Sequence, residues 1–107
     1  MRFRDRKRIL IVAYDAGGAA ILSSWVKKNA EHRFSFCLEG RAVSYFDKIP
    51  GILIQGREAL KDLAEIDFIL TGTGWQSDLE KRAIGAAKKA GVPVAAFLDH
   101  WTNYRVF

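Results

Sequence analysis

The sequence has a single cysteine, Cys37, and no apolar run long enough to cross a membrane. One cysteine excludes an intramolecular disulfide, and its place in the run Phe34–Leu38 predicts a buried strand residue. The longest apolar runs, Ile9–Tyr14 and Val92–Leu98, fall far below the ~18–20 residues of a membrane span, and the first lacks the cleavage site of a signal peptide. These absences predict a location in the reducing cytoplasm.

Net positive charge is small outside the first few residues. The chain has 17 Lys and Arg against 12 Asp and Glu, a net charge of +5. Residues 1–8 hold five cations against Asp5, a net +4, which leaves +1 for the remainder. A nearly neutral body does not favour nucleic-acid binding, and residues 1–7 are expected to form a solvated basic leader. With 107 residues, half of them apolar, the chain is expected to fold as one domain.

Apolar runs bounded by glycine, proline and polar residues predict five strands. These are Arg8–Tyr14, Arg33–Glu39, Gly51–Gln55, Asp67–Thr71 and Val92–Leu98. Helical spacing predicts the intervening helices Ala19–Ala30, Arg41–Lys48, Arg57–Glu65 and Ser77–Ala90. The spacing of Ser77 and Glu80 is typical of a capping box at the start of the last helix, and Gly91 is expected to end it. The residues expected to face inward in that helix are Leu79, Ala83, Ala86, Ala87 and Ala90.

Strands that alternate with helices predict a doubly wound α/β fold: a five-stranded parallel sheet of Rossmann-like order 3-2-1-4-5 with helices on both faces. Ligands of such sheets bind beyond the carboxyl ends of the strands. In this frame Asp15 is interpreted as a loop cap, Asp78 as an acid of the first helical turn and His32 as a surface histidine.

Several phosphate-binding motifs are missing. The sequence has neither Gly-x-Gly-x-x-Gly nor Gly-x-x-x-x-Gly-Lys-Ser/Thr, which excludes the usual dinucleotide and phosphate-loop sites. The run Thr71–Gly74 resembles a flavodoxin phosphate loop, but that loop belongs after the first strand. The third strand ends in Gln55 rather than a carboxylate, which argues against a phospho-receiver domain. We therefore expect neither a cofactor nor a metal.

Glycine and polar residues nevertheless collect after the predicted strands. Gly17 and Gly18 lead into a helix N-terminus, where backbone N–H groups can receive a phosphate or carboxylate; a tight strand-to-helix turn is the alternative. Thr73, Gly74 and Trp75 follow the fourth strand and are candidate substrate-binding residues.

The densest group of functional side chains follows the fifth strand. Asp99 is a candidate general base or orienter of His100, whose imidazole suits proton transfer near neutral pH. The candidate substrate-binding residues of this segment are Trp101, Asn103, Tyr104 and Arg105. In the alternative interpretation Trp75, Trp101 and Tyr104 form an apolar patch for a partner chain, and the protein is an interaction module without a small-molecule site.

Together these loops resemble the N-terminal Rossmann-like half of the GT-B superfamily of nucleotide-sugar glycosyltransferases and UDP-N-acetylglucosamine 2-epimerases, and more narrowly small proteins of bacterial polysaccharide biosynthesis. The resemblance runs from the turn at Gly17 and Gly18 to residues 99–107. It places Asp99 where the epimerases have the Glu of His-x-Glu-Ala-Gly. After the fourth strand those epimerases have Gly-Asp-Thr where this chain has Gly72-Thr73-Gly74, and the missing acid argues against epimerase activity.

The resemblance implies a sugar or nucleotide-sugar ligand at the C-terminal edge of the sheet. GT-B enzymes react in the cleft between two such domains, and 107 residues supply part of the first. The isolated chain is therefore expected to be inactive. A truncated protein, one subunit of a two-chain enzyme and a stand-alone binding module all fit, and the partner is a second domain, another chain or a second copy.

Overall fold

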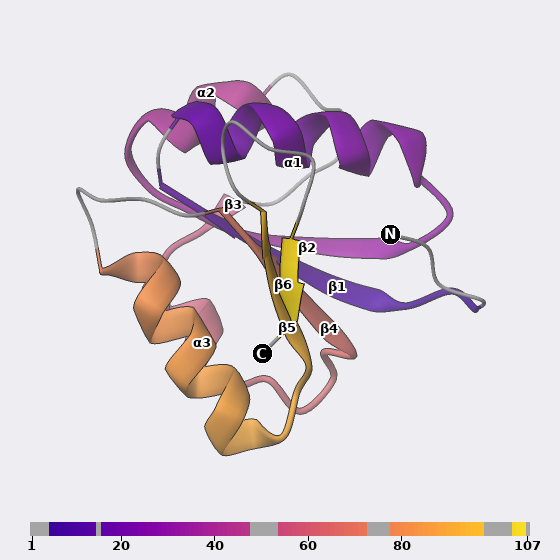
Figure 1. The fold of residues 1–107 in the computed structure, drawn as a ribbon, viewed down its shortest axis with the longest axis vertical. Coiled ribbons are helices and arrows are strands. Elements are labelled where there is room, and N and C mark those ends of the chain that lie inside the picture. The colour runs from indigo at the N-terminus through magenta and orange to yellow at the C-terminus, as the bar shows by residue number, and fades with distance from the viewer. Residues whose placement is uncertain (1–4, 15, 48–53, 73–77, 98–103, 107) are drawn as a thin grey trace.

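The chain folds into a mostly parallel β-sheet with helices packed on both faces (Figure 1). The structure, a computed structural model, describes residues 5–14, 16–47, 54–72, 78–97 and 104–106; from residue 96 onward it describes the backbone alone. Its strands are β1 (Arg8–Ala13), β2 (Arg33–Leu38), β3 (Ile54–Gln55), β4 (Phe68–Thr71), β5 (Val94–Phe97) and β6 (Tyr104–Val106). Its helices are α1 (Ala16–Lys28), α2 (Val43–Phe46), α3 (Leu79–Ala90) and the 3-10 turns η1 (Gly40–Ala42) and η2 (Arg57–Lys61).

The strand order is β3-β2-β1-β4-β5-β6. The first five strands are parallel in the predicted order 3-2-1-4-5, which confirms the predicted fold class. A sixth strand, β6, pairs antiparallel with β5 and was not expected. Crossovers run outward in both directions from β1 and β4, so the order of the strands reverses between these two.

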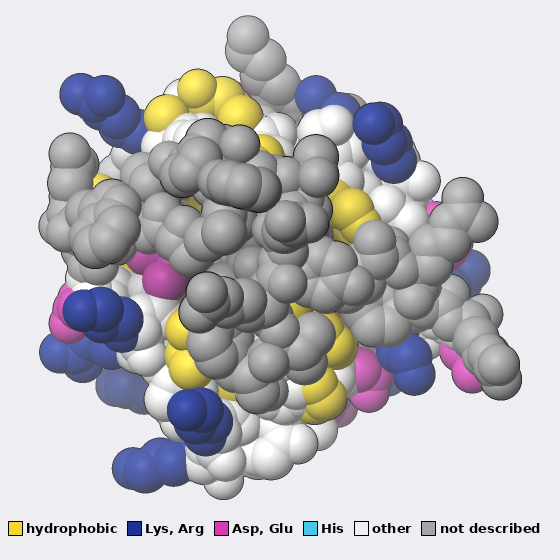
Figure 2. All heavy atoms as spheres, in the orientation of Figure 1, with side chains coloured by type: hydrophobic (Ala, Val, Ile, Leu, Met, Phe, Trp, Pro, Cys, Tyr) yellow, Lys and Arg dark blue, Asp and Glu magenta, His cyan; other side chains and the backbone are white. Residues whose placement is uncertain are grey.

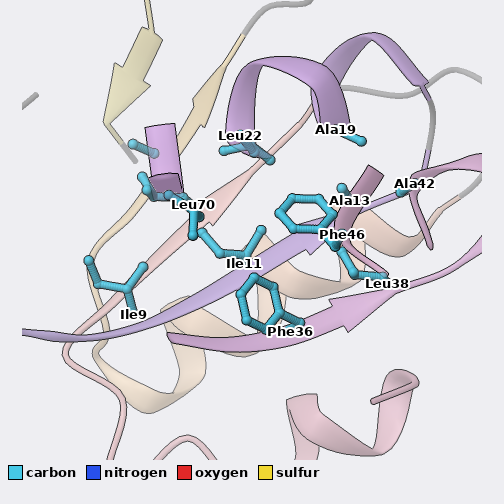
Figure 3. Close-up of a cluster of buried hydrophobic side chains, with 12 residues drawn as sticks. Ile9, Ile11, Ala13, Ala19, Leu22, Phe36, Leu38, Ala42, Phe46 and Leu70 are labelled. Atoms are coloured by element: carbon cyan, nitrogen blue, oxygen red, sulfur yellow. The ribbon is translucent and has the colours of Figure 1, made fainter. Parts of the chain in front are cut away.

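Alternation along the buried strands divides the core into two layers. On one face of the sheet, Ile9, Ile11 and Ala13 of β1 belong to a cluster with residues of α1 and α2 (Figure 3). Leu22 of α1 and Phe46 of α2 are fully buried in this cluster. Leu10 and Val12 face the other layer, which is covered by α3. A strand buried on both faces is continuously apolar, and this explains why β1 is readily recognised in the sequence.

Three predicted helices have different limits in the structure. The first begins at Ala16, so that Gly17 and Gly18 lie inside its first turn and not in the preceding loop. The second is a 3-10 turn followed by a single α-helical turn. The third is the short 3-10 turn η2, because the backbone is extended at Asp62, whose Oδ1 accepts the N–H of Ala64 at 3.2 Å.

Helix α3 follows its predicted limits closely, and Ala86 is half-buried against the core as expected. Ala90, also expected to face inward, is exposed, whereas Glu80 is buried. Gly91 ends the helix in a left-handed conformation, with φ of 75°, as a C-terminal glycine is expected to do. Among the described residues, no helix has the length and apolar character needed to cross a membrane.

His32 is buried, with 6% of the residue exposed, which corrects its interpretation as a surface histidine. Its Nδ1 accepts the backbone N–H of Lys7 at 2.9 Å. Its ring lies parallel to that of Trp25 and edge-on to Phe34, with centroids 6.2 Å apart in each pair. Tertiary contacts thus bury a residue whose neighbours in sequence, Glu31 and Arg33, are exposed.

Candidate functional site

The carboxyl ends of β1 and β4 meet at the point where strand order reverses, and two glycines bring their connections together. A Cβ added to Gly72, directly after β4, would lie 3.0 Å from the Cα of Gly18 in the first turn of α1. A side chain at Gly72 would have to displace this backbone. The start of α1 is therefore held directly beside the end of β4.

A buried carboxylate lies at the same place. Glu80, in the first turn of α3, is 4% exposed, and its Oε2 accepts the backbone N–H of Tyr14 at 3.0 Å. The same oxygen is 3.9 Å from the position of a Cβ on Gly72. Glu80 therefore connects α3 to the residue that follows β1.

The predicted capping box of Ser77 and Glu80 lies partly outside the described residues. Asp78 occupies the N-cap position of α3 without a side-chain capping bond, and Ser77 lies outside the described residues. Spacing within the helix indicated a local partner for Glu80; the bond that the structure describes joins its Oε2 to a residue 66 positions earlier. Only the fold brings the two together.

Tyr14 and Gly40 form the next part of the edge. Gly40 has φ of 62°, and a Cβ there would lie 2.9 Å from Cε2 of the Tyr14 ring. The backbone oxygen of Tyr14 accepts the N–H of Ala42 at 3.0 Å. Tyr14 was predicted to end the first strand; it follows β1 and places a half-buried aromatic ring at the edge formed by the carboxyl ends of the strands.

Arg57 joins two acids across this edge. Its Nε donates to Glu39 Oε2 at 3.0 Å, and its Nη1 lies 2.9 Å from Asp78 Oδ1. Asp78 also accepts from Arg82 Nε at 2.6 Å. Hydrogen bonds from Arg82 and then Arg57 lower the pKa of Asp78, and bonds to Glu39 and Asp78 raise that of Arg57. Arg57 was not among the predicted site residues, although its position just after β3 indicates that it lies at this edge of the sheet.

Thr71 supplies a buried hydroxyl at the end of β4. The residue is fully buried, and within the described part of the chain its Oγ1 has no hydrogen-bond partner. Unsatisfied buried hydroxyls are uncommon because desolvation is costly. Thr71 therefore places a hydroxyl without a described hydrogen-bond partner at the end of β4.

The structure describes part of the predicted site. Gly17 is half-buried and Gly18 buried in the first turn of α1. Tyr104 and Arg105 lie in β6 rather than in a loop, opposite Phe97 and Ala96 of β5. The other predicted site residues lie outside the described ranges: Thr73, Gly74, Trp75, Asp99, His100, Trp101 and Asn103. Asp15 lies outside them as well.

Within the described residues, no group of three or more His, Cys, Asp or Glu side chains could hold a metal ion. Comparison with models of known protein families gave no match, and neither did searches of curated proteins and of solved structures. The functional proposal therefore depends on the residues and geometry of the sheet edge.

Proposed function

We propose that this chain binds a sugar or nucleotide sugar where β1 and β4 part, as the N-terminal half of, or a module related to, a GT-B-type sugar-processing protein of polysaccharide biosynthesis. The observation that carries the proposal is the contact between Gly18 and Gly72. It sets the N-terminus of α1 at the reversal of strand order, which is where doubly wound sheets take their ligands.

The start of α1 suits the phosphate of such a ligand. The first turn has no acidic residue, and Gly17 has no side chain to obstruct an approaching group. Backbone N–H groups and the helix dipole favour an anion at such a terminus. The N-terminus of α1 would therefore bind the diphosphate of a nucleotide sugar.

The neighbouring side chains suit a sugar. Glu39 is a half-buried carboxylate, and carboxylates accept hydrogen bonds from hydroxyl groups. The half-buried ring of Tyr14 adds an aromatic surface. In the proposal Trp75, Trp101, Asn103, Tyr104 and Arg105 complete the binding surface.

The proposal assigns catalysis to Asp99 and His100 once a second domain or chain closes the cleft. A general base acts when it is within hydrogen-bond reach of a positioned substrate. The chain alone is therefore expected to bind without turnover.

Calorimetric titration with UDP-N-acetylglucosamine tests the binding. Gly17→Asp places a negative charge at the N-terminus of α1, where it stabilises the helix but repels phosphate. We expect it to weaken binding about tenfold or more. Ser24→Asp, on an exposed position farther along α1, is the matched control and should leave the affinity unchanged. Absence of binding at millimolar ligand, or equal affinities for Gly17→Asp and the wild type, would refute the proposal.

A further inference from the structure

The 3-10 turn η2 separates two hollows of opposite charge. The first is a groove of about 510 Å³ between η2 and α3. Its charged lining is wholly basic: Arg57, Lys61, Arg82 and Lys89. Its floor is apolar or small and consists of Leu60, Gly85 and Ala86. Figure 2 shows Lys and Arg side chains gathered at the lower left, where Figure 1 places α3.

The spacing along α3 explains the groove. Residues 82, 85, 86 and 89 recur at the helical i, i+3, i+4, i+7 interval and so share one stripe. Lys81 and Lys88 are exposed on the same helix but do not line the groove. The basic stripe is thus one defined face of α3.

The second hollow, of about 370 Å³, lies on the other side of η2 and is acidic. Its charged lining consists of Glu58, Asp62 and Glu65. The backbone N–H of Gly56 donates to Glu58 at 2.9 Å and lowers the pKa of that carboxyl, which keeps it charged. Basic and acidic surfaces of similar size therefore adjoin along a single turn.

This arrangement is self-complementary. In a two-fold dimer each surface patch meets its counterpart in reverse order. If η2 of one copy enters the groove of the other, symmetry places the second η2 in the first groove. The acidic side of each η2 then faces the basic stripe of the partner's α3. Opposite charges therefore meet between each η2 and the α3 of the other copy.

Gly85 gives independent support for the close approach of another chain at the groove. It lies in the interior of α3, and a Cβ added to it would meet no described atom within 4 Å. Glycine is less favourable than alanine inside a helix, and no contact in the described part of the chain requires it here. A glycine on the groove floor allows another backbone to approach closely.

We propose that the protein forms a symmetric homodimer in which η2 of each copy occupies the groove between η2 and α3 of the other. Glu58, Asp62 and Glu65 of one copy then lie against Arg82 and Lys89 of the second. Because the interface is charged, it should weaken as salt increases.

Sedimentation velocity of the full chain at low salt, from micromolar to near-millimolar concentration, tests this proposal. We expect a dimer that Lys61→Glu/Lys89→Glu weakens at least about tenfold. Lys81→Glu/Lys88→Glu makes the same change of charge away from the groove and should leave the dimer intact. Gly85→Leu fills the groove without changing charge and should also dissociate it.

A charge exchange gives the strictest test. Asp62→Lys/Glu65→Lys makes the acidic hollow basic and should be monomeric alone. Mixed with Lys61→Glu/Lys89→Glu, it should form a heterodimer, because both halves of the interface again pair opposite charges. A wild-type monomer at every concentration would overturn the proposal. So would a dimer that survives the groove variants, or a mixture of the two charge variants that remains monomeric.

Discussion

The carboxylate of Glu80 on α3 accepts the backbone N–H of Tyr14, directly after β1, at 3.0 Å. This bond joins the two connections that flank the reversal of strand order. A backbone donor buried without its acceptor is costly, so the bond contributes to stability as well as to the shape of the edge.

Glu80→Ala should destabilise the protein by about 1–3 kcal/mol, because it leaves the Tyr14 N–H without this acceptor. Glu80→Gln retains an oxygen at the same place and should cost less. Urea unfolding measures both. Asp47→Ala, at an exposed carboxylate, should stay within about 0.5 kcal/mol of the wild type. Equal stability of Glu80→Ala and Asp47→Ala would show that the bond to Tyr14 contributes nothing.

Two glycine variants should change stability in opposite directions. Gly72→Ala forces a Cβ to within 3.0 Å of the Gly18 backbone and should cost about 1–3 kcal/mol. Gly85→Ala meets open space inside a helix and should stabilise the folded chain by about 0.5–1 kcal/mol. Thermal or urea unfolding at a fixed protein concentration compares the two. A neutral Gly72→Ala would mean that the contact at the sheet edge is looser than described.

Cys37 should make stability depend on alkaline pH. Burial raises its pKa from 9.0 to about 12, so the unfolded chain loses the thiol proton first as pH rises. Its contribution to the free energy of unfolding is complete below about pH 9 and is lost between about pH 9 and 12. The difference in stability between wild type and Cys37→Ala should therefore shrink across this window. A constant difference would contradict the burial of the thiol.

Asp78 should titrate below its ordinary pKa of 3.8, because Arg82 and Arg57 donate to it. Its contribution to stability is present above that value and is lost as pH falls through the lowered pKa. Carboxyl NMR titration should show a larger upward shift of this pKa in Arg82→Ala than in Arg57→Ala. The reverse order would indicate that Arg57 is the stronger partner.

Continuous apolar runs made the strands predictable. The run of β1 is buried on both faces, so its composition alone indicated its structure, and the order of the five parallel strands followed from the alternation of strands and helices. A helix was predicted over residues 57–65 because Leu60, Leu63 and Ala64 have helical spacing, but the structure has only the 3-10 turn η2 there. The side chain of Asp62 instead bonds the Ala64 N–H, and the helix does not continue.

The candidate site was less predictable, because its described bonds join distant segments. Local spacing indicated a cap for Glu80 but gave no sign of the bond between its Oε2 and the Tyr14 N–H. Arg57 becomes a bridge only when β2 and α3 bring Glu39 and Asp78 to it. Glycines were identified as site residues in advance, but the contact between Gly18 and Gly72 depends on the pairing of β1 with β4.

The most direct test of the central claim is the position of the bound ligand, measured by amide chemical shifts during titration with UDP-N-acetylglucosamine. Binding where β1 and β4 part should shift the amides of Tyr14, Gly18 and Gly72, whose connections meet there. Asn29 and Ile66, which lie before β2 and β4 at the opposite edge of the sheet, should not move. Shifts confined to that opposite edge, or none at millimolar ligand, would contradict the account.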